Sequence, residues 1–80
     1  MNCLICNAGA DRIQTMSDWV ELRCPGCGHY RVSGTFFAEM KTRKQSFDVE
    51  KARGWLEGQR HVNINEVPMI ESSENDLVMP

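Results

Sequence analysis

The sequence predicts a small α+β domain in which two to three short antiparallel strands are followed by one or two α-helices. The chain has 80 residues, so a single domain is expected. Apolar and polar residues alternate in the first half and apolar residues recur at helical spacing in the second half. Two cysteine pairs flank the alternating segment. A domain this small often needs disulfides or a metal ion for stability, because its core buries little apolar surface.

The strands are expected between the cysteine pairs and just after the second pair. In residues 18–23, Val20 and Leu22 share one face of an alternating strand, and Trp19, Glu21 and Arg23 share the other. A tight turn is expected before this strand, because serine and aspartate favour turns. The three predicted strands are residues 12–16, 18–23 and 29–32.

Two helices are predicted in the second half. The first has Phe36, Phe37 and Met40 on one face, and Ser33 or Thr35 supplies its N-cap. The second is expected to begin at Ser46. Its apolar stripe consists of Val49, Ala52, Trp55 and Leu56.

These patterns divide the chain into three segments. Residues 1–34 are expected to form the strand-containing module and residues 35–60 a helical extension packed on it. Residues 61–80 carry four acidic residues and no Lys or Arg. They lack a clear period, so a mostly disordered acidic tail is expected there.

Charge and hydropathy restrict the classes of partner. The formal net charge is −2, and all nine Lys and Arg lie within residues 1–60. A strongly basic nucleic-acid binder would look different, so such a role must rest on a local patch. No signal peptide or apolar run of membrane-spanning length is visible. A cytoplasmic location with no membrane partner is therefore expected, and thiols there stay reduced.

The cysteines are the most specific signal in the chain. Cys3 and Cys6 form one C-x2-C pair, Cys24 and Cys27 form another, and 17 residues separate the pairs. Reduced cysteines at this spacing are typical of a tetrahedral zinc site. Small or left-handed-tolerant residues follow each pair, as the tight turns require. One structural Zn²⁺ is therefore predicted, with these four cysteines as its ligands.

Other interpretations of the cysteines are weaker. A redox C-x-x-C normally sits in a larger α/β domain, which is absent here. Iron is the sharper rival, since four thiolates accept either metal. His29 could be a fifth ligand, although a histidine that hydrogen-bonds on a strand is the simpler interpretation. Four cysteines close the coordination sphere, and no catalytic constellation is visible, so neither an enzyme nor a small-molecule substrate is expected.

With both pairs in place, residues 1–34 resemble a zinc ribbon (zinc β-ribbon). Within that class, the segment from Trp19 to Cys27 is similar to the second knuckle of the phage Mu Com family of translational activators. Members of that family are small, hold one four-cysteine zinc site and bind messenger RNA. The resemblance implies the same four zinc ligands, and it implies a contact role for Arg23, just before the knuckle.

A second resemblance covers more of the chain. The segments 27–35, 53–56 and 68–70 are similar to the N-terminal module of assorted uncharacterised bacterial and phage proteins. In those proteins a ribbon precedes a helical segment and often a larger effector or sensor domain. This resemblance implies an architecture but no chemistry. It leaves open whether the 80 residues stand alone or form part of such a protein.

Two partner classes are nearly tied. Nucleic acid is the first, through a local basic patch with an aromatic side chain that stacks on a base. Trp19 fits this role and a core role equally, whereas a core role is favoured for Tyr30. The residues proposed for this surface are Arg12, Trp19, Arg23, Arg31, Lys41, Arg43 and Lys44.

A protein partner is the second class, and it would make the chain an interaction or adaptor module. This class is supported by the large number of apolar residues in the second half of the chain, some of which would stay exposed and bind a partner. The competing interpretation is that both helices simply pack on the strands and complete one core. These apolar residues are Phe36, Phe37, Met40, Phe47, Val49, Trp55 and Leu56.

Overall fold

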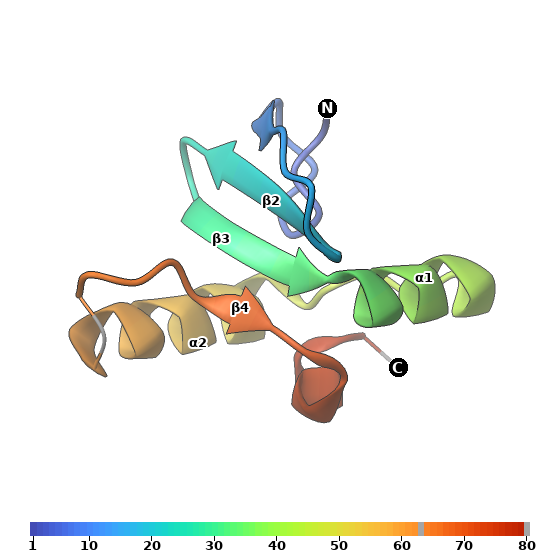
Figure 1. The fold of residues 1–80 in the computed structure, drawn as a ribbon. Helices are drawn as coiled ribbons and strands as arrows, with labels where there is room; N and C mark the ends of the chain where they lie inside the picture. Colours follow the sequence, from blue (N-terminus) through green and yellow to red (C-terminus); the bar gives the residue numbers. More distant parts are fainter. Residues whose placement is uncertain (63, 80) are drawn as a thin grey trace.

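The computed structural model describes residues 1–62 and 64–79, and it confirms a small α+β domain. Three strands precede the two α-helices, a fourth strand follows them, and the helices pack on the resulting four-stranded sheet (Figure 1). The elements are β1 (Asp11–Ile13), β2 (Trp19–Cys24), β3 (Gly28–Ser33), α1 (Gly34–Arg43), α2 (Val49–Val62), β4 (Met69–Ile70) and a 3₁₀ helix, η1 (Ser72–Leu77).

The sheet has the order β1-β2-β3-β4. The first three strands pair antiparallel, as predicted, and β4 adds a parallel partner at the far side of β3. In the register of β2 and β3, Val20 lies opposite Val32 and Leu22 opposite Tyr30. All four are buried, so this face of the sheet carries the hydrophobic core.

Both helices contribute to that core. Phe36 and Met40 of α1 and Ala52 and Leu56 of α2 are buried in one cluster with the sheet residues. The longest helix, α2, has 14 residues. Within the part of the chain that the structure describes, no helix combines the length and apolar character needed to cross a membrane.

The helix starts follow from local capping. The Ser33 hydroxyl accepts a hydrogen bond from the Phe36 N–H at 3.2 Å, so Ser33 caps α1. The second helix begins at Val49 rather than Ser46, because the Asp48 carboxylate accepts from the Lys51 N–H at 3.1 Å and supplies the cap. Phe47, just before Asp48, forms an isolated antiparallel bridge with Val78 and is not helical.

The prediction of a disordered tail is wrong for the described part of residues 61–80. Ile70 of β4 pairs with Val32, and Leu77 and Val78 are also buried in the core. The Arg31 N–H donates to the Pro68 carbonyl at 2.8 Å, which begins the pairing. Backbone pairing therefore orders a segment whose own sequence shows no period. Residues 63 and 80 lie outside the described residues.

Candidate metal centre

Two turns bring the four cysteines together. The first knuckle, residues 3–7, precedes β1, and the second is the turn of the β2–β3 hairpin. All four Sγ atoms lie within 4.8 Å of one another. The Cys3 and Cys27 sulfurs are 3.8 Å apart, and the Cys6 and Cys24 sulfurs are 3.5 Å apart. A tetrahedral ion with bonds of about 2.3 Å places its sulfurs about 3.8 Å apart, so the set could hold one metal ion.

The backbone of each knuckle has the left-handed residue that the sequence predicts. Asn7 has a φ of 63° and Gly28 a φ of 88°. In the first knuckle the Asn7 N–H donates to the Cys3 carbonyl at 3.0 Å. In the second, Gly28 pairs with Cys24 and so resumes the ladder at once. Each turn therefore points both of its cysteines to one side.

Burial makes two of these thiols, those of Cys24 and Cys27, weaker acids. Cys3, Cys24 and Cys27 are buried, and Cys6 is half-buried. Burial raises the pKa of Cys27 to about 12, and burial also raises the pKa of Cys24. The pKa of Cys6 is lowered to about 6, chiefly because a backbone hydrogen bond from Ala8 stabilises its thiolate. Four adjacent thiolates therefore need a positive ion between them.

Tyr30 supports the first knuckle from the core. Its side chain is fully buried, which confirms the favoured core interpretation. The hydroxyl lies 3.1 Å from the Cys3 sulfur and accepts a hydrogen bond from the Leu4 N–H at 3.0 Å. Burial raises the pKa of Tyr30 above its ordinary value, so the hydroxyl keeps its proton and can donate it to a Cys3 thiolate. Tyr30 thereby links the metal centre to the sheet.

Two arginines of α2 hold the second knuckle, and the sequence analysis missed both. The Arg53 Nε donates to the Cys27 sulfur at 3.4 Å. The Arg60 guanidinium donates to the Cys27 carbonyl at 2.7 Å and to the His29 carbonyl at 3.3 Å. The spacing of seven residues put them on one helix face, but only the docking of α2 showed what that face meets.

Arg53 balances charge at the sulfur cluster. Four thiolates and one divalent cation carry a net charge of about −2. The hydrogen bond to Cys27 raises the pKa of Arg53, as expected for a cation beside a thiolate. Partners of metal ligands commonly change metal affinity without touching the metal.

Replacing Arg53 with methionine is therefore expected to weaken metal binding at the four cysteines about tenfold, the lower end of the effect of such outer partners. Competition with a chromophoric chelator measures the affinity. Lys51→Met is the control, because Lys51 is an exposed cation on the same helix and makes no side-chain contact with the cysteines. Equal affinities for the two variants would contradict the charge-balancing role.

Gly28 offers a second test of the knuckle. An added Cβ there would lie 2.5 Å from an Arg60 guanidinium nitrogen, on a backbone that side chains rarely adopt. Gly28→Ala is expected to destabilise the folded protein by about 1–3 kcal/mol. In Gly54→Ala nothing lies within 4 Å of the new Cβ, so a gain of about 0.5–1 kcal/mol is expected in α2. Urea unfolding measures both, and equal signs would contradict the argument.

The sheet face opposite the core holds a polar cluster around Glu21. This carboxylate is 8% exposed and accepts from the Trp19 Nε1 at 3.1 Å and the Arg31 Nε at 2.9 Å. The His29 Nε2 lies 2.6 Å from its other oxygen. Burial alone would raise the pKa of Glu21, but hydrogen bonds from His29, Trp19 and Arg31 lower it below the usual value. His29 therefore faces Glu21, as in the simpler interpretation.

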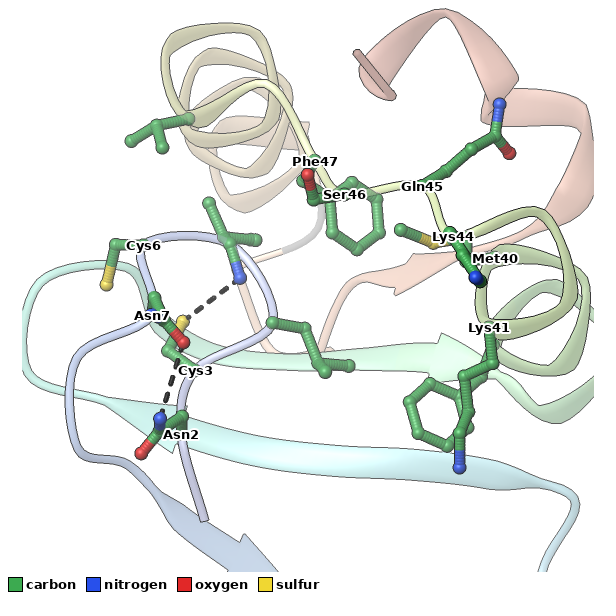
Figure 2. Close-up of a pocket in the computed structure, with 14 residues that line it drawn as sticks. Asn2, Cys3, Cys6, Asn7, Met40, Lys41, Lys44, Gln45, Ser46 and Phe47 are labelled. Atoms are coloured by element: carbon green, nitrogen blue, oxygen red, sulfur yellow. Dashed lines mark hydrogen bonds between the residues drawn. The ribbon is translucent and has the colours of Figure 1, made fainter. Parts of the chain in front are cut away.

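The structure separates the seven residues proposed to contact nucleic acid. Trp19 and Arg31 meet at Glu21, with the guanidinium carbon 4.8 Å from the centre of the Trp19 ring. Lys41 and Lys44 line a cavity of about 630 Å³ beside the first knuckle (Figure 2). The three that remain are exposed: Arg12 on β1, Arg23 on β2 and Arg43 on α1.

No protein-family model matches this chain, and no curated protein or solved structure is significantly similar to it. The chemistry of the cysteine cluster therefore rests on its own geometry. That geometry could hold a metal ion, and it brings together the four residues that the spacing singles out. The arginines of α2 and Tyr30 complete the surroundings of the site.

Proposed function

We propose that Cys3, Cys6, Cys24 and Cys27 hold one zinc ion and that the protein is a zinc-ribbon module that acts by binding a partner. The observation that carries this proposal is the approach of the four sulfurs to within 4.8 Å, at separations that suit tetrahedral coordination. The reduced thiols that this site needs fit a cytoplasmic location.

The role of the ion is structural and the protein is not an enzyme. With four cysteine ligands the coordination sphere is full, which leaves no position for water or a substrate. The ion instead joins the first knuckle to the β2–β3 hairpin, two segments that are separate in the sequence. Elemental analysis of purified, reduced protein is expected to give one zinc per chain. Iron in place of zinc would mean the same four-cysteine site with a different metal. Folded, reduced protein that contains neither zinc nor iron would refute the proposal.

A protein partner suits the surface better than nucleic acid does. A base-stacking site needs an accessible aromatic ring and free cations. Trp19 is half-buried, and its indole N–H and the Arg31 guanidinium are both bound by Glu21, which also cancels the arginine's charge. The chain's net charge of −2 further disfavours phosphate binding.

Nucleic acid is the second candidate because Arg12 and Arg23 are exposed on neighbouring strands. The sequence resemblance gives Arg23 a contact role. Titration of zinc-loaded protein with single-stranded RNA and with duplex DNA, followed by tryptophan fluorescence at two salt concentrations, separates the two classes. We expect a flat response. A quench that weakens with salt would favour nucleic acid, since phosphate contacts release counterions.

A further inference from the structure

The cavity beside the first knuckle is the most promising unassigned surface. We name it the knuckle cavity; three separate segments form its walls, namely residues 2–7, the part of α1 from Phe37 to Lys41, and residues 44–49, which connect α1 to α2 and include the first residue of α2. Figure 2 shows the labelled knuckle residues Asn2, Cys3, Cys6 and Asn7 on one side and Lys41 on the other, with Phe47 between them. Its volume of about 630 Å³ lies within the usual range for a ligand site.

Apolar side chains make up much of the lining. Met40 and Phe47 are buried at the cavity, whereas Leu4 and Phe37 are only half-buried and Val49 is 37% exposed. Each of these last three comes from a different wall. Large apolar side chains left open to solvent at one concave place indicate a surface that another molecule covers.

The wall of the cavity that faces the first knuckle is positive, although the protein is acidic overall. Lys41 and Lys44 are the only cationic residues of the lining, and they lie across the cavity from Cys3 and Cys6 (Figure 2). Among the described residues, no carboxylate lies within ion-pair distance of either lysine. The Lys41 ammonium lies 5.1 Å from the centre of the Phe37 ring, so positive charge and aromatic surface occur together.

We propose that the knuckle cavity binds a short segment of a partner protein that combines apolar side chains with acidic ones. The apolar side chains occupy the space between Leu4, Phe37 and Val49, and the carboxylates pair with Lys41 and Lys44. This inference rests on the proposed binding function and names its partner class. RNA fits less well, because phosphates would meet two lysines and an otherwise mostly uncharged, apolar lining.

The cavity also depends on the metal. Cys3 and Cys6 belong to its lining as well as to the sulfur cluster. The ion that fixes these cysteines therefore fixes one wall of the cavity. Binding of the segment is accordingly coupled to zinc, while Lys41 lies on α1 and Lys44 is the C-cap of α1, a segment that contributes no ligand.

The test uses the full, zinc-loaded chain and fluorescein-labelled dodecapeptides. The main probe alternates Glu with Leu and Phe; one control peptide replaces each Glu by Lys, and another replaces each Leu and Phe by Ser. Fluorescence anisotropy is expected to detect binding of the main probe only. The double variant Lys41→Glu, Lys44→Glu is expected to weaken it at least about tenfold. Arg43→Glu, a matched change on the same helix outside the cavity, is expected to change it less than about twofold.

The outcomes separate this inference from the proposed function. Zinc-loaded, folded protein that ignores the main probe, or that binds it equally in the double variant, overturns the cavity assignment and leaves the zinc module intact. Preferential binding of a uridine dodecamer through Lys41 and Lys44, or self-association that these lysines control, also overturns it. Protein that contains no metal and still binds the probe through the two lysines supports the lysine contacts, but it refutes both the zinc proposal and the coupling of the cavity to the ion.

Discussion

Cys24→Ser is expected to abolish cooperative unfolding of this protein. A structural zinc site contributes roughly 10–16 kcal/mol of apparent binding energy, and this energy is largely the folding energy of such a domain. Cys24 is 2% exposed and ends β2, so its loss affects both the metal and the edge of the core. Thermal melting followed by circular dichroism, with zinc in excess, measures the effect. A sharp transition near that of the parent would contradict this prediction.

A pair of variants at Cys6 separates lost coordination from lost packing. Cys6 is the only half-buried member of the four, so its position can accommodate a larger ring. Cys6→His keeps a nitrogen ligand that zinc accepts, whereas Cys6→Ser does not. The histidine variant is expected to melt cooperatively when zinc is present and to lose the transition with a chelator. Identical behaviour of the two variants would show that coordination at this position does not matter.

Ile70→Ala carries the second large effect. Ile70 is fully buried and pairs with Val32 in the β3–β4 ladder. Shortening a buried isoleucine to alanine costs about 2–5 kcal/mol through lost apolar burial and the cavity left behind. For a domain of this size that is a large share of its stability. Urea unfolding at saturating zinc is expected to show a much lower midpoint.

Ile64→Ala is the matched control, because Ile64 has the same side chain and is 81% exposed. A change within about 0.5 kcal/mol is expected there, as for most surface substitutions. Equal effects at Ile64 and Ile70 would mean that the C-terminal segment does not pack as the structure places it. Of the two changes, only the one at buried Ile70 is expected to lower stability. This comparison also tests the corrected view of residues 64–79.

The sulfur cluster and most of the fold were open to prediction because their signals are local. Cysteine spacing, the residues Asn7 and Gly28 after each pair, and the alternation of Val20 and Leu22 all act within a few residues. The metal geometry then needs only that the chain turns back between the pairs. These local signals predicted the grouping of the four cysteines, the three antiparallel strands and the two helices.

The features that sequence reasoning missed depend on contacts between distant segments. Arg53 and Arg60 carry no local signal of their role, which becomes visible only when α2 packs against Cys27. Glu21 read as part of an exposed polar face, but hydrogen bonds from three side chains allow its burial. The sequence left Trp19 open between base stacking and a core role. The hydrogen bond from its indole N–H to Glu21 now restricts its freedom to stack on a base.

The sequence by itself determined the four cysteines, their turns and the order of strands and helices, since each depends on spacing along a few residues. Tertiary structure alone decided that residues 68–70 and 77–78 join the core, that α2 places two arginines on the second knuckle, and that the first knuckle and α1 enclose a cavity. These features arise when segments far apart in the chain meet, and no local period records such a meeting.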